Sequence, residues 1–122
     1  MRAPILNALS YPHILESDFA VLDLAGKSIS FEDWDREKYP MLALGYDAAE
    51  SGDSSPIVYN AANEQAVEAF AEKRISFLSI YRVVRDVMEG EWPDEPQTIE
   101  EILEIDRDAR ERTDKKIRDY IA

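Results

Sequence analysis

The sequence predicts a mainly α-helical protein, a four-helix bundle preceded by an extended arm. After residue 39, apolar residues recur at helical spacing in four segments. A proline or a Ser/Thr suited to capping stands at the start of each segment. Before residue 39 the pattern is interrupted by Pro4, Pro12 and Gly26. We therefore place a domain boundary between residues 1–38 and 39–122.

The arm is expected to hold one short helix and one candidate β-hairpin. Pro4 suits the first position of a helix, and Tyr11-Pro12 should end it, because a residue before proline is pushed out of the α region. Apolar residues at 19–22 could form one strand. Residues 28–31 alternate with period two and could form the other, with Gly26-Lys27 as the turn between them.

The next two helices are predicted from their ends. One should begin at Tyr39-Pro40 and stop at Ser51-Gly52. The following one has Ser54 or Ser55 as N-cap and Pro56 just inside. Its apolar positions are mostly small, which indicates close approach to another helix: Val58, Ala62, Ala66, Ala69 and Phe70.

The fourth segment has the most regular apolar pattern. Ser79 is the predicted cap, Leu78 and Val83 have the spacing of a hydrophobic staple, and Gly90 should end the helix. The core residues expected here are Ile80, Val83, Val84, Val87 and Met88.

The last helix opens with a capping box between Thr98 and Glu101. Four acid-first pairs at i,i+4 should support it: Asp106–Arg110, Asp108–Arg112, Glu111–Lys115 and Asp114–Arg118. Its buried side is predicted to comprise Ile99, Ile102, Leu103, Ala109, Ile117, Tyr120 and Ile121.

Composition excludes several classes of function. The 122 residues include 26 acidic and 14 basic side chains, a net charge of −12, which disfavours binding to nucleic acid or to an anionic membrane. There is no cysteine for a disulfide or thiolate metal site. No signal peptide and no apolar run of membrane-spanning length is visible, so a cytoplasmic protein is expected.

Few residues suggest chemistry. His13 has no local partners, and the acidic run 32–35 lacks the glycine and terminal glutamate of a calcium loop. For both, a solvated loop is favoured over a ligand role. Trp34 and Trp92 are expected to cover the end of the bundle rather than stack on a ligand. No glycine-rich phosphate loop is present.

The segment Asn60-Ala61-Ala62-Asn63-Glu64 is unusual inside a predicted helix, because asparagine is a poor helix former. We expect the two amides to hydrogen-bond a neighbouring segment. A structural polar contact is favoured over a catalytic one.

These residues carry a resemblance to a known family. The stretches concerned are Met1-Arg2-Ala3-Pro4-Ile5, Tyr39-Pro40-Met41-Leu42, Asn60-Ala61-Ala62-Asn63-Glu64, Arg74-Ile75, and Asp106 with Ala109 and Arg110. Together they resemble the C-terminal portion of the 1-deoxy-D-xylulose 5-phosphate reductoisomerases, with methionine where the family has cysteine at position 41. The resemblance spans nearly the whole chain.

The resemblance implies an NADPH-dependent enzyme of isoprenoid biosynthesis that makes 2-C-methyl-D-erythritol 4-phosphate. In that family the NADPH-binding domain and the divalent-metal site (Mg, Mn or Co) lie upstream of this segment. It implies no catalytic, cofactor-binding or metal-binding residue in this chain. Only Met1 occupies a family position close to the substrate. Residues 1–38 would be the end of the catalytic domain and a linker arm, and residues 39–122 the C-terminal helical domain.

Two functions are therefore expected. In the first, the chain is a C-terminal fragment that supports the active site of the reductoisomerase and is inactive alone, because bound metal and cofactor supply the chemistry. Its partners would be the N-terminal and catalytic portions. In the alternative, it is a stand-alone helical interaction module. A bundle separated from its partner should expose apolar surface, at Ile5, Leu6, Leu9 and residues 19–24, through which such a chain could self-associate.

Overall fold

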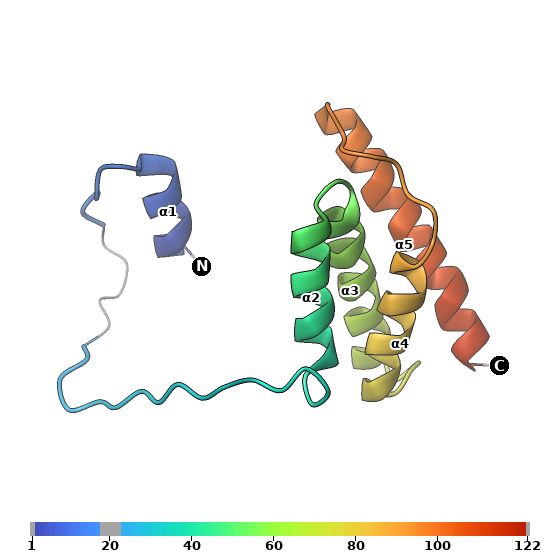
Figure 1. Cartoon of the computed structure of the whole chain (residues 1–122), viewed down its shortest axis with the longest axis horizontal. Helices are drawn as coiled ribbons and strands as arrows, with labels where there is room; N and C mark the ends of the chain where they lie inside the picture. The colour runs from blue at the N-terminus through green and yellow to red at the C-terminus, as the bar shows by residue number, and fades with distance from the viewer. Residues whose placement is uncertain (1, 18–22, 122) are drawn as a thin grey trace. The chain divides into compact units, whose positions relative to one another are not determined.

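The computed structural model describes residues 2–17 and 23–121, and the side chain of residue 121 is not described. The chain divides into two compact units, Met1–Asp33 and Trp34–Ala122. Among the described residues, one helix falls in the first unit and four in the second, and Figure 1 labels them along the chain. The predicted mainly α fold is confirmed, and the described residues contain no strand. The domain boundary at residues 38 and 39 stays a prediction.

The first unit contains helix α1, Arg2–Ser10. It begins two residues before the predicted Pro4 and ends, as expected, before Tyr11-Pro12. Gly26 lies in a turn with a φ of +71°, closed by a hydrogen bond of 3.1 Å from the Lys27 N–H to the Leu24 carbonyl. The predicted turn is present, but residues 28–31 form no strand, since no other strand pairs with them among the described residues. Residues 19–22 lie outside the described part.

Helix α2, Pro40–Ser51, has both predicted ends, and helix α3, Ser55–Ala71, has the predicted start. Pro40 occupies the start of α2, and Gly52 follows its end with a φ of 68°, a conformation that glycine adopts at little cost. Ser54 is the N-cap residue of α3, but its side chain makes no capping hydrogen bond.

Helix α4 spans Phe77–Met88. It begins three residues earlier than predicted, because a cap at Ser79 would place the first helical residue at Ile80. Ser76 is the N-cap, and its Oγ accepts a hydrogen bond of 3.3 Å from the Ser79 N–H. The predicted staple is therefore wrong, and Leu78 is 71% exposed. The same spacing recurs one turn earlier, where Ile75 and Ile80 both belong to the core.

Helix α5, Ile99–Ile121, has half of the predicted capping box. The Glu101 N–H donates to Thr98 Oγ1 at 3.2 Å, while the Glu101 carboxylate accepts from the Gln97 N–H at 2.6 Å. Two of the four predicted ion pairs are present within the described residues, Asp106–Arg110 and Asp108–Arg112. Asp114 instead accepts a hydrogen bond of 3.2 Å from Gln65.

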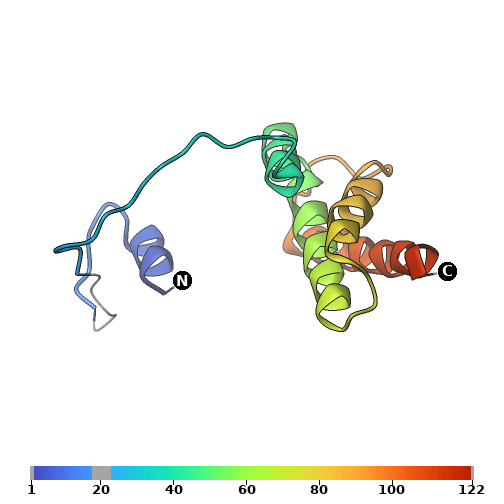
Figure 2. The same ribbon diagram turned by 90° about the horizontal axis from the view of Figure 1, so that it is seen from below.

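The core lies around α3, which contacts each of the other three bundle helices. Figures 1 and 2 both show α3 beside α2 and α4. Small side chains permit this central position, because they let the helix backbones approach closely. The fully buried alanines of α3 are Ala61, Ala62, Ala66 and Ala69. On α2, Gly45 serves the same purpose, since a Cβ there would lie 3.2 Å from the Tyr59 hydroxyl.

The buried side of α5 differs from the prediction. Ala109 and Ile117 are buried as expected, but Ile105 and Thr113 complete the buried row, and Thr113 Oγ1 donates to the Ala109 carbonyl at 2.6 Å. The other predicted core residues with a described side chain are at least 38% exposed: Ile99, Ile102, Leu103 and Tyr120. The reason is length. Helix α5 has 23 residues and α4 has 12. At about 1.5 Å per residue, α5 is roughly twice as long as α4 and outreaches it.

Candidate functional site

The Asn60–Glu64 segment lies on α3, opposite the middle of α5. Glu64 Oε2 accepts a hydrogen bond of 2.6 Å from Arg110, and Arg110 also binds Asp106 at 2.8 Å, so one guanidinium joins two carboxylates. Asn60 is exposed and Asn63 is half-buried. Neither amide has a hydrogen-bond partner among the described residues. The predicted contact therefore exists, but Glu64 makes it, whereas the predicted amide bonds are absent from the described part.

The charges stabilise this contact between Arg110 and its two carboxylates. Hydrogen bonds from Arg110 to Asp106 and then to Glu64 raise the pKa of the guanidinium above its already high ordinary value. Arg110 therefore remains charged at any physiological pH. With both carboxylates on it, the guanidinium holds α3 against α5 and has no role as an acid or base.

A second polar cluster fixes the loop between α4 and α5. Trp92 Nε1 donates to the Val87 carbonyl at 2.9 Å, and Arg112 donates to the Glu91 carbonyl at 3.0 Å. The Arg112 guanidinium also lies 4.1 Å from the centre of the Trp92 ring, a cation–π contact. Trp92 packs against the core, as predicted for a residue that covers the bundle end.

Ser54 connects this loop to the turn between α2 and α3. The serine is 1% exposed, and its Oγ donates a hydrogen bond of 2.6 Å to the Pro93 carbonyl. The residue that should cap α3 therefore satisfies a carbonyl of a different loop. This bond joins residues 39 positions apart.

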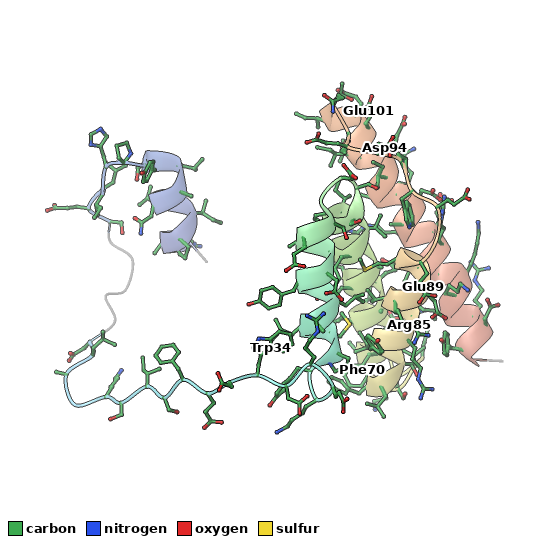
Figure 3. The ribbon with its side chains drawn as sticks, in the orientation of Figure 1. Trp34, Phe70, Arg85, Glu89, Asp94 and Glu101 are labelled. Carbon is green, nitrogen blue, oxygen red and sulfur yellow. The ribbon has the colours of Figure 1, made fainter. Side chains whose placement is uncertain are left out.

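The loop between α4 and α5 and the start of α5 line an open groove of about 530 Å³. Figure 3 shows two of its lining residues, Asp94 and Glu101, at the end of α5 that projects from the bundle. Its lining combines apolar rings with acids: Trp92, Pro93, Asp94, Glu95, Pro96, Gln97, Glu101, Glu104, Ile105 and Asp108.

The single residues that the sequence analysis considered for chemistry do not come together in one site within the described part of the chain. His13 is exposed. The side chains of the acidic run 32–35 are exposed too, and Asp35 accepts hydrogen bonds from the Glu37 and Lys38 N–H groups. Trp34 stacks on Tyr46 with ring centres 5.4 Å apart. Met1, the residue expected near the substrate, lies outside the described residues. Within residues 2–17 and 23–121, no three His, Asp or Glu side chains are grouped to hold a metal ion.

Comparison with known proteins accounts for this arrangement. The profile of the DXP reductoisomerase C-terminal domain matches residues 1–112. The chain belongs to the DXP reductoisomerase family. The resemblance seen in the sequence is thereby confirmed.

Curated reductoisomerases match over the same region. The enzyme of Chlorobium chlorochromatii is 46% identical over 112 residues, which are 91% of this chain and 29% of the relative. The enzyme of Acidithiobacillus ferrooxidans is 44% identical over 112 residues, again 91% of this chain and 29% of the relative. The chain thus spans less than a third of the length of these reductoisomerases.

Solved reductoisomerases share the fold. The enzyme of Zymomonas mobilis in complex with NADPH superposes with a TM-score of 0.77 at 35% identity, covering 95% of this chain and 31% of that one. A reductoisomerase in complex with NADPH, fosmidomycin and magnesium gives 0.68 at 32% identity, covering 95% of this chain and 31% of that one. No helix in the described part of this chain is both long and apolar enough to cross a membrane.

Sequence reasoning missed the two contacts that shape the groove, Ser54–Pro93 and Arg112–Trp92. Each joins residues at least 20 positions apart, and neither follows a spacing rule. The only local signal was the serine itself, and it pointed to a helix cap.

Proposed function

We propose that this chain acts as the C-terminal helical domain of a 1-deoxy-D-xylulose 5-phosphate reductoisomerase and supports an active site built by the rest of the enzyme. The observation that carries the proposal is the family match over residues 1–112, together with 46% identity to a curated enzyme. A fixed scaffold that holds catalytic groups within fractions of an ångström is a prerequisite of such chemistry.

The geometry of the chain agrees with a supporting role. Its two polar clusters are ion pairs and loop-pinning hydrogen bonds that fix helices and a loop in place. NADPH and a divalent cation, named with the solved relatives, supply hydride transfer and charge stabilisation in the parent reaction. The domain division is part of this proposal, with residues 1–38 ending the catalytic domain and forming a linker arm, and residues 39–122 forming the helical domain.

A chimera tests the proposal. The matched 112 residues of the Chlorobium chlorochromatii enzyme are replaced by those of this chain. NADPH oxidation is followed at saturating substrate with Mn²⁺. The chimera should turn over, while this chain alone and the relative lacking its matched region should both remain at background. An inactive but folded chimera, or turnover by this chain alone, would contradict the proposal.

The alternative is a stand-alone interaction module, as several large apolar side chains of the first unit are exposed. It predicts a chimera that folds but does not turn over.

A further inference from the structure

We infer that the loop–α5 surface, meaning the loop 91–98 and the exposed face of the first turns of α5, is where the upstream portion of the enzyme docks. The docking segment should be basic and carry large apolar side chains. This inference rests on the proposed function and assigns that partner a place on the bundle. Three features of the surface lead to it.

The first feature is apolar side chains that the bundle leaves uncovered. Ile99 is 70% exposed, Leu103 is 58% exposed and Ile102 is 39% exposed. They lie together on the first turns of α5, which start at the projecting end seen in Figure 1. Adjacent apolar residues on a helix face, beside a groove of about 530 Å³, are typical of a contact surface.

The second feature is charge of one sign. From Asp86 to Asp106, counting both, the sequence has nine acidic residues and no basic residue. Six of these acids have no ion-pair partner among the described residues: Glu91, Asp94, Glu95, Glu100, Glu101 and Glu104. A partner segment with Lys or Arg would find its complement here, and a second copy with the same acids would be repelled.

The third feature is the adjoining part of α3. Because Ser54 before α3 contacts Pro93 before α5, and Glu64 further along α3 pairs with Arg110 further along α5, the two helices run in the same direction. Asn60, one turn before Glu64, therefore lies level with Asp106, close to the loop–α5 surface. Its amide is exposed and has no hydrogen-bond partner among the described residues. A helix-interior asparagine costs stability, and an intermolecular hydrogen bond offsets that cost.

The family comparison supplies the occupant. This chain covers about three-tenths of the length of its curated relatives. The remaining part of such an enzyme is large enough to cover the surface. A rigid loop favours docking, because the Ser54 and Trp92 hydrogen bonds have already ordered it.

The test uses the chimera described above with two matched substitutions. Leu103→Asp alters the loop–α5 surface. Leu78→Asp alters another exposed leucine, 71% exposed against 58% for Leu103, at the start of α4 and at the other end of the bundle in Figure 1. Both side chains lie on helix exteriors, so both variants of the isolated chain should melt within about 2 °C of the unsubstituted chain. In the chimera, Leu103→Asp should lower kcat/KM at least about tenfold and Leu78→Asp less than about twofold.

Two further measurements test the role of the acidic residues and the position of the contact. Replacing Glu95 and Glu104, which line the groove, by lysine should also lower kcat/KM about tenfold, while the same reversal at the exposed Glu50 and Glu68 should have little effect. Hydrogen exchange should be slower for amides 92–104 in the chimera than in the isolated chain.

An active chimera in which Leu103→Asp and Leu78→Asp behave alike, or in which amides 92–104 exchange as in the isolated chain, would overturn the inference while leaving the proposed function intact. An inactive unsubstituted chimera would overturn both. An isolated chain that is dimeric in sedimentation, and that Leu103→Asp makes monomeric, would assign the surface to a second copy and refute the inference.

Discussion

Replacing Ile117 by alanine should destabilise the isolated chain strongly, whereas the same replacement at Ile99 should not. Both residues lie on α5, but Ile117 is fully buried and Ile99 is 70% exposed. The change removes the equivalent of about three methylene groups, worth about 2.4 kcal/mol at ~0.8 kcal/mol each. The cavity left in the core raises the loss to about 3–4 kcal/mol.

Urea and thermal unfolding followed by circular dichroism at 222 nm measure this difference. A loss of that size corresponds to a fall in Tm of about 10–15 °C for a domain of this length. Ile99→Ala should stay within about 0.5 kcal/mol of the unsubstituted chain, since an exposed side chain leaves no cavity. Equal losses for the two variants, or a loss below about 1 kcal/mol for Ile117→Ala, would refute the assignment of the buried side of α5.

Two further predictions concern single hydrogen bonds. Ser54→Ala should cost about 1–2 kcal/mol of unfolding free energy, because the Pro93 carbonyl loses its 2.6 Å donor, and the exposed Ser51→Ala is the control in the same urea titration. For Asp86, burial raises the carboxyl pKa, but hydrogen bonds from Arg85 and Tyr120 outweigh burial and lower it overall. A lowered pKa stabilises the fold above the unfolded value of about 3.9, and this stability is lost as the pH falls through the folded value. Tyr120→Phe, which removes the 3.0 Å bond to Asp86, should therefore lower the urea midpoint at pH 6 and lower it less at pH 2.5. A deficit equal at both pH values would count against the assigned role of Asp86.

Local rules predicted the helix boundaries well wherever one residue decided them. Pro40, Gly52 and Thr98 act through their own backbone geometry or their nearest neighbours, so their effect was visible in the sequence. The start of α4 was misplaced because Ser76 and Ser79 are both suitable caps. Burial of Ile75 and Ile80 in the core accompanies the earlier cap.

The candidate site was less predictable. The Asn60–Glu64 run was recognised as unusual, but its partner Arg110 is 46 residues away and had been assigned only to Asp106. The apolar residues at the start of α5 were assigned to the core, because periodicity reports which residues share a face and not what covers that face. The groove depends on the Ser54–Pro93 and Arg112–Trp92 contacts, which local spacing does not encode.

By itself, the sequence determined the α-helical class, most helix ends and the membership in the reductoisomerase family, because helical periodicity, caps and motifs are local properties of the chain. Only the tertiary structure decided which face of α5 is buried and that Glu64 pairs with Arg110. It also decided that acidic and apolar side chains line the same groove. Those features arise from the relative lengths and packing of helices distant in sequence, which pairwise spacing along the chain does not contain.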